Sequence, residues 1–242
     1  MARQVSKGTC TFCHCELSKS GVAKHLQFCQ QRIAGETKAQ GHQKAQQTRV
    51  FHLIVQGLYA PMYWMHLEVT AETTLAALDR FLRDIWLECC DHLSQFKIGN
   101  VRYCENPEMY ASWSMGRKDM DVRLDEVLNP GQACSYEYDF GSTTELTLKV
   151  ISEREVQAKE KAIQVLARNS LPLVPCGVCG KPATCTCTRC IYEGGGCLCG
   201  ACGEEHQCGE KRLKPLSLVN SPRAGVCGYT GSASEATYLA HL

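Results

Sequence analysis

The spacing of apolar and polar residues changes several times along the chain, and each change predicts a different element. Residues 50–55 are mostly apolar at consecutive positions, which is typical of a strand covered on both faces. A second strand is predicted from Tyr63 to Val69. From about Thr74 to Cys89 the apolar residues recur every three or four positions, which predicts an amphipathic helix whose N-terminus Thr70 or Thr73 can cap.

Shorter elements follow this helix. Residues 95–103 predict a β-hairpin, because a Gly-Asn pair separates two short runs with apolar residues. Residues 122–128 predict a short helical turn, and 133–140 and 146–152 predict two further strands. Residues 162–167 fit a strand, with a helix as the alternative. The body is therefore expected to be α+β, with a mixed or antiparallel sheet and one main helix.

Composition divides the chain into four parts. Residues 31–49 are basic, rich in Gln and nearly free of large apolar side chains, as in a linker, although part of this stretch is compatible with a helix. The predicted order is a Cys/His cluster at 8–30, this linker, an α+β body at 50–169, and a Cys- and Gly-rich module with a tail at 172–242. The two terminal modules are too small to bury an apolar core of their own.

The 18 cysteines indicate metal binding. No stretch approaches the ~20 apolar residues of a membrane-spanning helix, and no secretory signal is visible, so we expect a cytoplasmic protein that does not enter a membrane. Cytosolic proteins seldom use cysteines in disulfides. Metal ligation is therefore the expected use of cysteines that occur in closely spaced pairs.

The first predicted metal site has the spacing of a CCHC zinc finger. Its ligands are Cys10, Cys13, His25 and Cys29, and the last two share one face of a helix because they are four residues apart. Cys15 in place of Cys13 is a less favourable alternative. Zinc would have to supply the folding free energy of so short an element.

The C-terminal module holds eight further candidate ligands in four pairs. The pairs are Cys176/Cys179, Cys187/Cys190, Cys199/Cys202 and His206/Cys208. We expect interleaved pairing, in which the first and third pairs bind one zinc ion and the second and fourth bind another, so that the chain holds three zinc ions in total. Sequential pairing is the alternative. Cys185 and Cys197 also remain open as ligands in place of Cys187 and Cys199.

The other cysteines are assigned no metal. Cys89, Cys90, Cys104 and Cys134 lie in or beside the apolar body and are expected to be free structural thiols. Cys227 is left over in a Gly-rich tail, which is expected to wrap the zinc module through Val226 and Tyr229.

Charge is distributed unevenly, although the net charge is +1. Residues 1–49 contain eight Lys or Arg and two acidic residues, whereas 50–170 contain 12 basic and 18 acidic residues. A basic head favours an anionic partner such as nucleic acid or a ribonucleoprotein, and a solvated basic terminus is the alternative. The candidate phosphate contacts are Lys7, Lys19, Lys24 and Arg32. A lone finger reads only ~3 base pairs, so sequence-specific DNA recognition is not expected.

The body resembles a known family in four places: residues 51–58 with Pro61, the helix 74–86, residues 92–99, and Tyr136 to Gly141. These are similar to the family named after the third open reading frame of a root-inducing plasmid, whose members are also described as passengers of insertion elements. The resemblance implies an α+β fold and an association with mobile elements, but no particular activity. Members often continue the Tyr-x-Tyr-Asp-Phe-Gly motif with Asp, Trp and His, whereas Gly141 is followed here by Ser-Thr-Thr-Glu.

Catalysis is not the favoured function. Full sets of four protein ligands are typical of structural zinc, since catalytic zinc keeps one position for water. The sequence contains no Gly-x-Ser-x-Gly, Walker or His-Glu-x-x-His motif. We therefore expect a non-enzymatic zinc-binding adaptor that contacts nucleic acid or a ribonucleoprotein through its finger. The alternatives are a protein-interaction scaffold built on the C-terminal module and, less favoured, an enzyme that uses Glu137, Asp139 and Glu145.

Overall fold

The computed structural model describes residues 6–39, 47–105, 107, 116–157, 161–193, 195–216 and 219–232. The chain forms two compact units. The main unit comprises residues 1–170 and 220–242, and the C-terminal unit is Leu171–Val219. Parts of the predicted linker (40–46) and of the predicted tail (233–242) lie outside the described residues.

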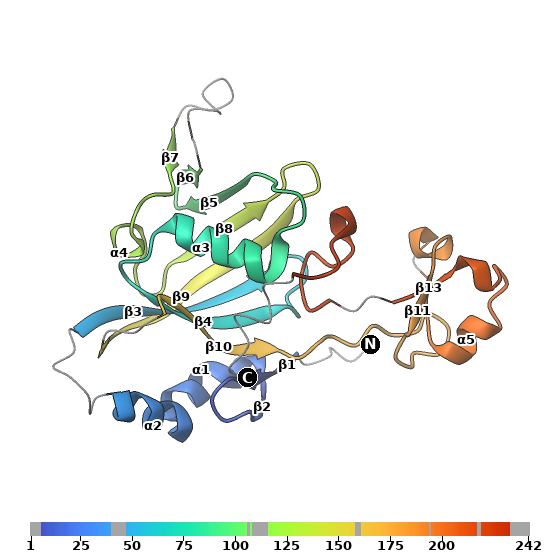
Figure 1. Cartoon of the computed structure of the whole chain (residues 1–242), viewed down its shortest axis with the longest axis horizontal. Coiled ribbons are helices and arrows are strands. Elements are labelled where there is room, and N and C mark those ends of the chain that lie inside the picture. The colour runs from blue at the N-terminus through green and yellow to red at the C-terminus, as the bar shows by residue number, and fades with distance from the viewer. Residues whose placement is uncertain are drawn as a thin grey trace. The chain divides into compact units, whose positions relative to one another are not determined.

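A ten-stranded sheet organises the described part of the main unit (Figure 1). In spatial order its strands are β2 (Glu16–Ser18), β1 (Lys7–Cys10), β10 (Ile163–Asn169), β4 (Trp64–Thr70), β3 (Gln47–Gly57), β9 (Thr144–Gln157), β8 (Ala133–Tyr138), β5 (Ser94–Ile98), β6 (Val101–Cys104) and β7 (Arg117–Asp119). Neighbouring strands are antiparallel except for β6 and β7, which are parallel. The predicted α+β class with a mixed sheet is confirmed.

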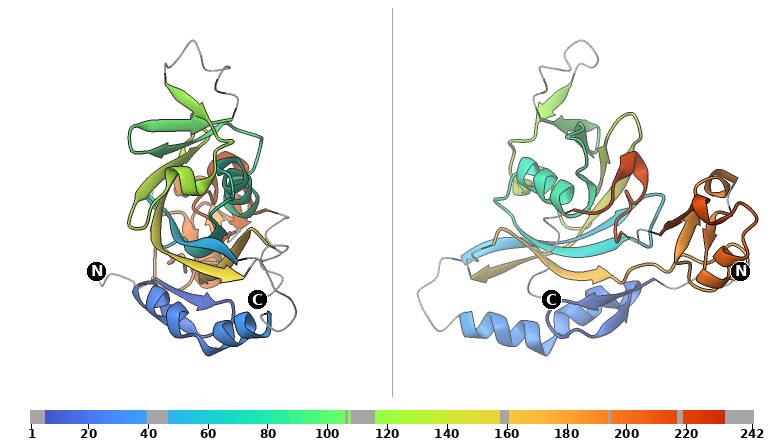
Figure 2. Two further views of the ribbon diagram at one scale, coloured as in Figure 1. Left: turned by 90° about the vertical axis from the view of Figure 1, so that its left-hand side faces the viewer. Right: turned by 45° about the vertical axis from the view of Figure 1, so that its right-hand side comes forward.

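The main helix, α3 (Leu75–Leu82), lies against one face of the curved sheet, as Figure 2 shows. The Thr74 hydroxyl caps it by accepting a hydrogen bond from the Ala77 N–H at 3.2 Å. The predicted caps Thr70 and Thr73 are therefore wrong, and their hydroxyls bond to each other at 2.8 Å. The helix continues as a π-helical turn, η1 (Arg83–Leu87). Its apolar face shares one core with alternate residues of the central strands, because those side chains project to the same side.

The shorter predictions in the body are also confirmed. Strands β5 and β6 form the hairpin, and Gly99 at its turn has φ of +58°, which glycine adopts without strain. The predicted helical turn is α4 (Leu124–Val127). Residues 163–169 form strand β10, so the strand predicted over 162–167 is confirmed and the helix alternative is wrong.

The N-terminal finger is part of the main unit instead of a separate module. Its strand β1 pairs with β10, and helix α1 (Lys19–Phe28) begins after Ser18, whose side chain makes no capping hydrogen bond. The finger shares one buried cluster with the body, made of Cys10, Val22, Leu26, Cys29, Trp64, Leu166 and Ala167. The finger therefore extends the sheet and covers part of its second face.

Residues 31–39 of the predicted linker lie in a second helix, α2 (Gln30–Ala39). Buried charges hold it in place. The Arg32 guanidinium lies 2.6 Å from Glu68 on β4 and 3.2 Å from Glu36, and Arg154 on β9 bridges the same two carboxylates at 2.5 and 2.6 Å. Because Arg32 and Glu68 are both buried and each has two charged partners, removal of either residue would leave the other with a single partner for a buried charge.

Two buried histidines lie beside this ion network. Nε2 of His52 and Nδ1 of His66 are 2.8 Å apart, so one ring donates a hydrogen bond to the other. Burial lowers the pKa of His52 to about 4, with the Arg32 charge adding to the effect. Burial also lowers the pKa of His66 to about 3. Both imidazoles are therefore neutral in the folded protein near neutral pH.

The C-terminal unit contains a three-stranded antiparallel sheet, in the order β12 (Cys197–Leu198), β11 (Cys185–Cys187) and β13 (Leu213–Pro215). A short helix, α5 (Gly200–Glu204), and two 3₁₀ turns, η3 (Cys190–Glu193) and η4 (Glu210–Arg212), complete the unit. The buried cluster between these elements consists of Cys176, Cys187, Leu198 and Cys199. Three of the four buried side chains in this unit's cluster are therefore cysteines.

The predicted placement of the tail is wrong. Residues 220–232, with the 3₁₀ turn η5 (Val226–Gly228), belong to the main unit instead of the C-terminal module. The Ser221 hydroxyl donates to the Trp86 carbonyl at 2.6 Å, and Arg168 donates to the Asn220 carbonyl. These bonds fix the start of the tail at the end of the main helix. Among the described residues, no helix is long and apolar enough to cross a membrane.

Substitution of Gly8 by alanine tests the docking of the finger. A Cβ at this position would lie 2.2 Å from the Arg168 carbonyl oxygen and 2.5 Å from the Trp64 ring. We expect Gly8→Ala to lower the free energy of unfolding by roughly 1–3 kcal/mol, as measured by urea denaturation. The control is Gly35→Ala, because a Cβ on that helical glycine meets nothing within 4 Å. Equal stability of the two variants would contradict the docked finger.

The histidine pair predicts a pH dependence. Unfolded imidazoles take up protons near pH 6.5, whereas the folded ones resist protonation down to their lowered pKa values, so acid favours the unfolded state. Between pH 7.5 and 5 we expect a loss of roughly 2 kcal/mol of unfolding free energy for each imidazole. The double variant His52→Gln/His66→Gln should lose less over this range, and an identical pH slope would contradict the interpretation.

Candidate metal centres

The finger residues predicted as ligands lie together. The ligand atoms of Cys10, Cys13, His25 and Cys29 are all within 4.8 Å of one another. The two cysteine sulfurs at 10 and 29 are 4.0 Å apart, and Sγ of Cys13 is 3.3 Å from Nε2 of His25. Four ligands around one ion, at about 2.3 Å for sulfur and 2.0 Å for nitrogen, lie roughly 3.4–3.8 Å from one another. The cluster is close to this geometry.

Local structure brings these four side chains together. Strand β1 ends at Cys10, the following turn presents Cys13, and α1 carries His25 and ends just before Cys29. Burial raises the pKa of the Cys10 thiol to about 11. A bound cation would reverse this effect, because coordination requires and stabilises the thiolate.

The eight C-terminal ligands form two clusters with interleaved pairs. Cys176, Cys179, Cys199 and Cys202 form one, and Cys187, Cys190, His206 and Cys208 form the other, each with all ligand atoms within 4.8 Å. The sulfur of Cys190 lies 3.5 Å from Nε2 of His206 and 3.6 Å from the Cys208 sulfur. The first pair therefore faces the third and the second faces the fourth, so the sequential alternative is excluded by position.

Backbone N–H groups donate to the first cysteine sulfur of each C-terminal cluster and favour its thiolate form, which is the form that binds a cation. The N–H groups of Cys179 and Cys199 donate to the Cys176 sulfur and lower the pKa of that thiol to about 6. The N–H of Cys190 does the same for Cys187, whose pKa is also about 6. Thiolates are thus favoured at both positions near neutral pH.

The structure also separates the ambiguous cysteines. Cys187 and Cys199 face their clusters, whereas the Cys185 thiol donates to the Leu198 carbonyl at 3.4 Å. Cys197 and Cys15 belong to none of the clusters formed by the described residues. Cys104 and Cys134 are buried in the apolar core, as expected for structural thiols.

A fourth cluster was not predicted. Cys89, Cys90, His92 and Cys227 also place four ligand atoms within 4.8 Å of one another. Cys89 and Cys90 are expected from the sequence as free structural thiols beside the apolar body, and Cys227 is left over, so their grouping with His92 is not foreseen. The signal in the sequence was the Cys-Cys-x-His run, but its fourth member lies more than 130 positions along the chain.

The predicted acidic face does not assemble into an open site. Glu137 and Glu145 are register partners on β8 and β9. Asp139 instead binds the fully buried Arg223 at 2.7 Å, which holds the pKa of its carboxyl at about 2. Because this charge is already compensated, Asp139 is a structural ion-pair partner.

Most of the predicted phosphate contacts already have partners within the protein. Lys7 pairs with Glu16 at 2.7 Å, and the Lys19 ammonium donates to the Pro61 carbonyl at 2.8 Å and to the Gln56 side chain. Arg32 is buried against Glu68, so its assignment as a phosphate contact is wrong. Lys24 is exposed on α1.

Substitution of one ligand tests the C-terminal clusters. Cys187→Ser should remove one metal ion per chain and destabilise the C-terminal unit, because three ligands no longer close the tetrahedron. The main unit should remain folded. Metal analysis of the purified protein measures the loss of the ion. Urea denaturation followed by tryptophan fluorescence shows that the main unit is still folded, since Trp64 and Trp86 lie in that unit. Cys197→Ser is the matched control, and unchanged metal content in Cys187→Ser would contradict the assignment.

Comparison with known proteins places the body in a family. Residues 50–181 match the family model described as "Plasmid pRiA4b ORF-3-like protein". This matched range includes Cys176 and Cys179 but not the finger. No curated protein matches the chain. One solved structure, a protein of unknown function from Methanosarcina mazei Go1, is similar with a TM-score of 0.42 and 16% identity over 50% of this chain and 69% of that one. Because the family model spans more than half of its 242 residues, the chain belongs to the plasmid pRiA4b ORF-3-like family.

Proposed function

We propose that this protein is a zinc-binding interaction protein, in which three zinc ions stabilise the finger and the C-terminal unit, and the C-terminal unit binds a protein partner. The observation that carries the zinc assignment is the closed ligand set. Each of the three predicted clusters offers four sulfur or imidazole ligands within 4.8 Å, the donor types and number of structural zinc.

The composition of the C-terminal unit supports a folding role for these ions. Its buried cluster contains three ligand cysteines and Leu198. Such an interior offers little apolar area, so the free energy of metal binding would replace hydrophobic burial. A unit stabilised in this way is free to use its surface for contact with a partner.

Two exposed apolar side chains accompany the C-terminal ligands. Val178, between Cys176 and Cys179, is 71% exposed, and Ile191, directly after Cys190, is 43% exposed. Each lies in a turn beside predicted ligands, so a bound ion would restrict the movement of its backbone. Rigid, exposed apolar groups favour contact with another protein, because ordering them costs little entropy on binding.

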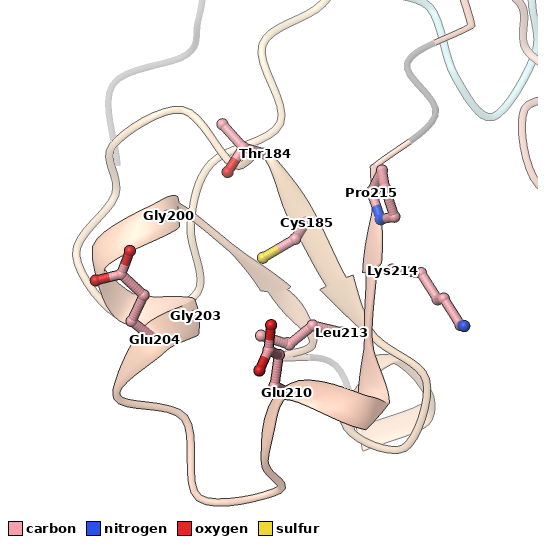
Figure 3. Close-up of a pocket in the computed structure, with 9 residues that line it drawn as sticks. All are labelled: Thr184, Cys185, Gly200, Gly203, Glu204, Glu210, Leu213, Lys214 and Pro215. Atoms are coloured by element: carbon pink, nitrogen blue, oxygen red, sulfur yellow. The ribbon is translucent and has the colours of Figure 1, made fainter.

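The same unit contains a cavity of about 680 Å³ (Figure 3). Cys185 and Leu213 give it apolar lining, and Glu204 and Glu210 contribute carboxylates from α5 and η4, with Lys214 on the strand that follows. An apolar surface beside two carboxylates suits an aliphatic side chain next to a Lys or Arg. We infer that the partner presents a short segment of this kind.

Nucleic acid is the second candidate partner. The surplus of basic residues in 1–49 and the exposed Lys24 favour it, and contact would be made through phosphates. The internal partners of Lys7, Lys19 and Arg32 count against it. We therefore rank the protein partner first.

A peptide array probed with the tagged full-length protein tests this ranking. We expect retention of peptides in which a Lys or Arg adjoins Leu, Ile or Val, and at least a tenfold loss of signal in Glu204→Gln/Glu210→Gln. Glu205→Gln is the matched control, because Glu205 is exposed but does not line the cavity.

Two results would contradict the proposal. Equal loss of signal in Glu205→Gln would show a general charge effect in place of a defined cavity. Absence of peptide binding, together with an RNA gel shift that weakens with salt and is lost in Lys24→Ala, would favour the nucleic-acid candidate.

A further inference from the structure

The fourth Cys/His cluster joins two segments that are far apart in the sequence. Cys89, Cys90 and His92 follow the π-helical turn η1, and Cys227 lies in η5 of the tail. All four residues belong to the main unit, and none is a ligand in the other three clusters. We propose that they bind a fourth metal ion of the zinc type, and that this ion fastens the tail to the body.

The distances fit one tetrahedral ion. Sγ of Cys227 is 4.0 Å from Sγ of Cys90 and 3.4 Å from Nε2 of His92, close to the roughly 3.4–3.8 Å separation of ligands on a zinc ion. Three sulfurs and one imidazole nitrogen form the same donor set as the finger cluster. The site is therefore complete without a ligand from another molecule.

The backbone that carries the first three ligands is held by Tyr138. Its hydroxyl accepts hydrogen bonds from the N–H groups of Cys89 and His92, at 3.4 and 3.3 Å, and donates one to Glu88 at 3.0 Å. Between them, Asp91 adopts a left-handed φ of 56° and binds Arg83 at 2.5 Å. This segment is thus fixed by contacts that do not involve its own thiols.

The start of the tail is positioned by Arg223, which is fully buried. Its guanidinium binds Asp139 at 2.7 Å and the Thr144 hydroxyl at 3.1 Å. A few residues later, Cys227 adopts a left-handed φ of 50°. This conformation is uncommon for a residue with a Cβ, and such residues occur preferentially at functional sites.

Arg223 also donates hydrogen bonds to one ligand sulfur of the proposed site. Its Nε and Nη2 lie 3.4 and 3.3 Å from the Cys89 sulfur. Three thiolates, a neutral imidazole and a divalent ion carry one net negative charge, and N–H donors to a ligand sulfur stabilise it.

Exposure distinguishes this site from the other three. Each of those contains at least one buried ligand, whereas Cys90 and Cys227 are exposed and Cys89 and His92 are half-buried. Solvent and chelators therefore reach the fourth ion most readily. We expect it to exchange first, so that the tail is released from the body while the other sites stay filled.

Metal content is the first test, and it is independent of the proposed interaction function. Zinc-loaded Cys227→Ser and Cys90→Ser should each contain one zinc ion fewer than the wild-type protein by mass spectrometry of metals. Cys15→Ser is the matched control, because Cys15 is an exposed thiol outside every cluster of the described residues. Loss of the ion in both variants supports the site, and wild-type zinc content in both would overturn it.

Limited trypsin digestion is the second test. Because Arg223 is buried, cleavage after it should be slow in the wild-type protein and at least tenfold faster in Cys227→Ser, with release of residues 224–242. Equal cleavage rates would overturn the fastening of the tail. A Cys90–Cys227 disulfide in intact-mass analysis of protein purified without oxygen, together with only three zinc ions, would replace the metal site by a redox bond.

Discussion

The central strands β3 and β4 are buried on both faces, so the sheet requires a layer on each side. Alternate residues of β4 show the division. Met65 and Leu67 pack in the core that contains α3, whereas Trp64 packs in the cluster that contains the finger. His66 and Glu68 lie on the side of Trp64, against His52 and Arg32. The finger and α2 are therefore structural parts of the body.

This arrangement gives the N-terminal cluster a consequence beyond its own fold. Cys10 ends the strand β1 that pairs with β10, and Cys29 separates α1 from α2, the helix that carries Arg32. A metal ion bound by these two residues would fix the strand and the helices of the covering layer relative to one another. The buried Arg32–Glu68 pair, which Glu36 and Arg154 extend into a network, then completes the attachment.

The Tyr136 to Gly141 motif of the family has a structural meaning here. Tyr136 donates to the buried Asp79 at 2.7 Å within the core, Tyr138 holds the backbone of residues 88–92, and Asp139 binds Arg223 of the tail. The motif thus connects the main helix, the segment after it and the tail. These are the contacts that bring the fourth cluster together.

Features that depend on short-range patterns could be predicted before the fold was known. Helical spacing defined α3, a Gly-Asn turn defined the β5–β6 hairpin, and ligand spacing identified the three clusters at the termini. The tertiary structure decided what depends on distant pairing: the finger on β10, Arg32 as a buried ion-pair partner, and Cys227 beside Cys89. Such contacts leave no periodic signal, because they arise only when long loops close and side chains meet in the folded chain.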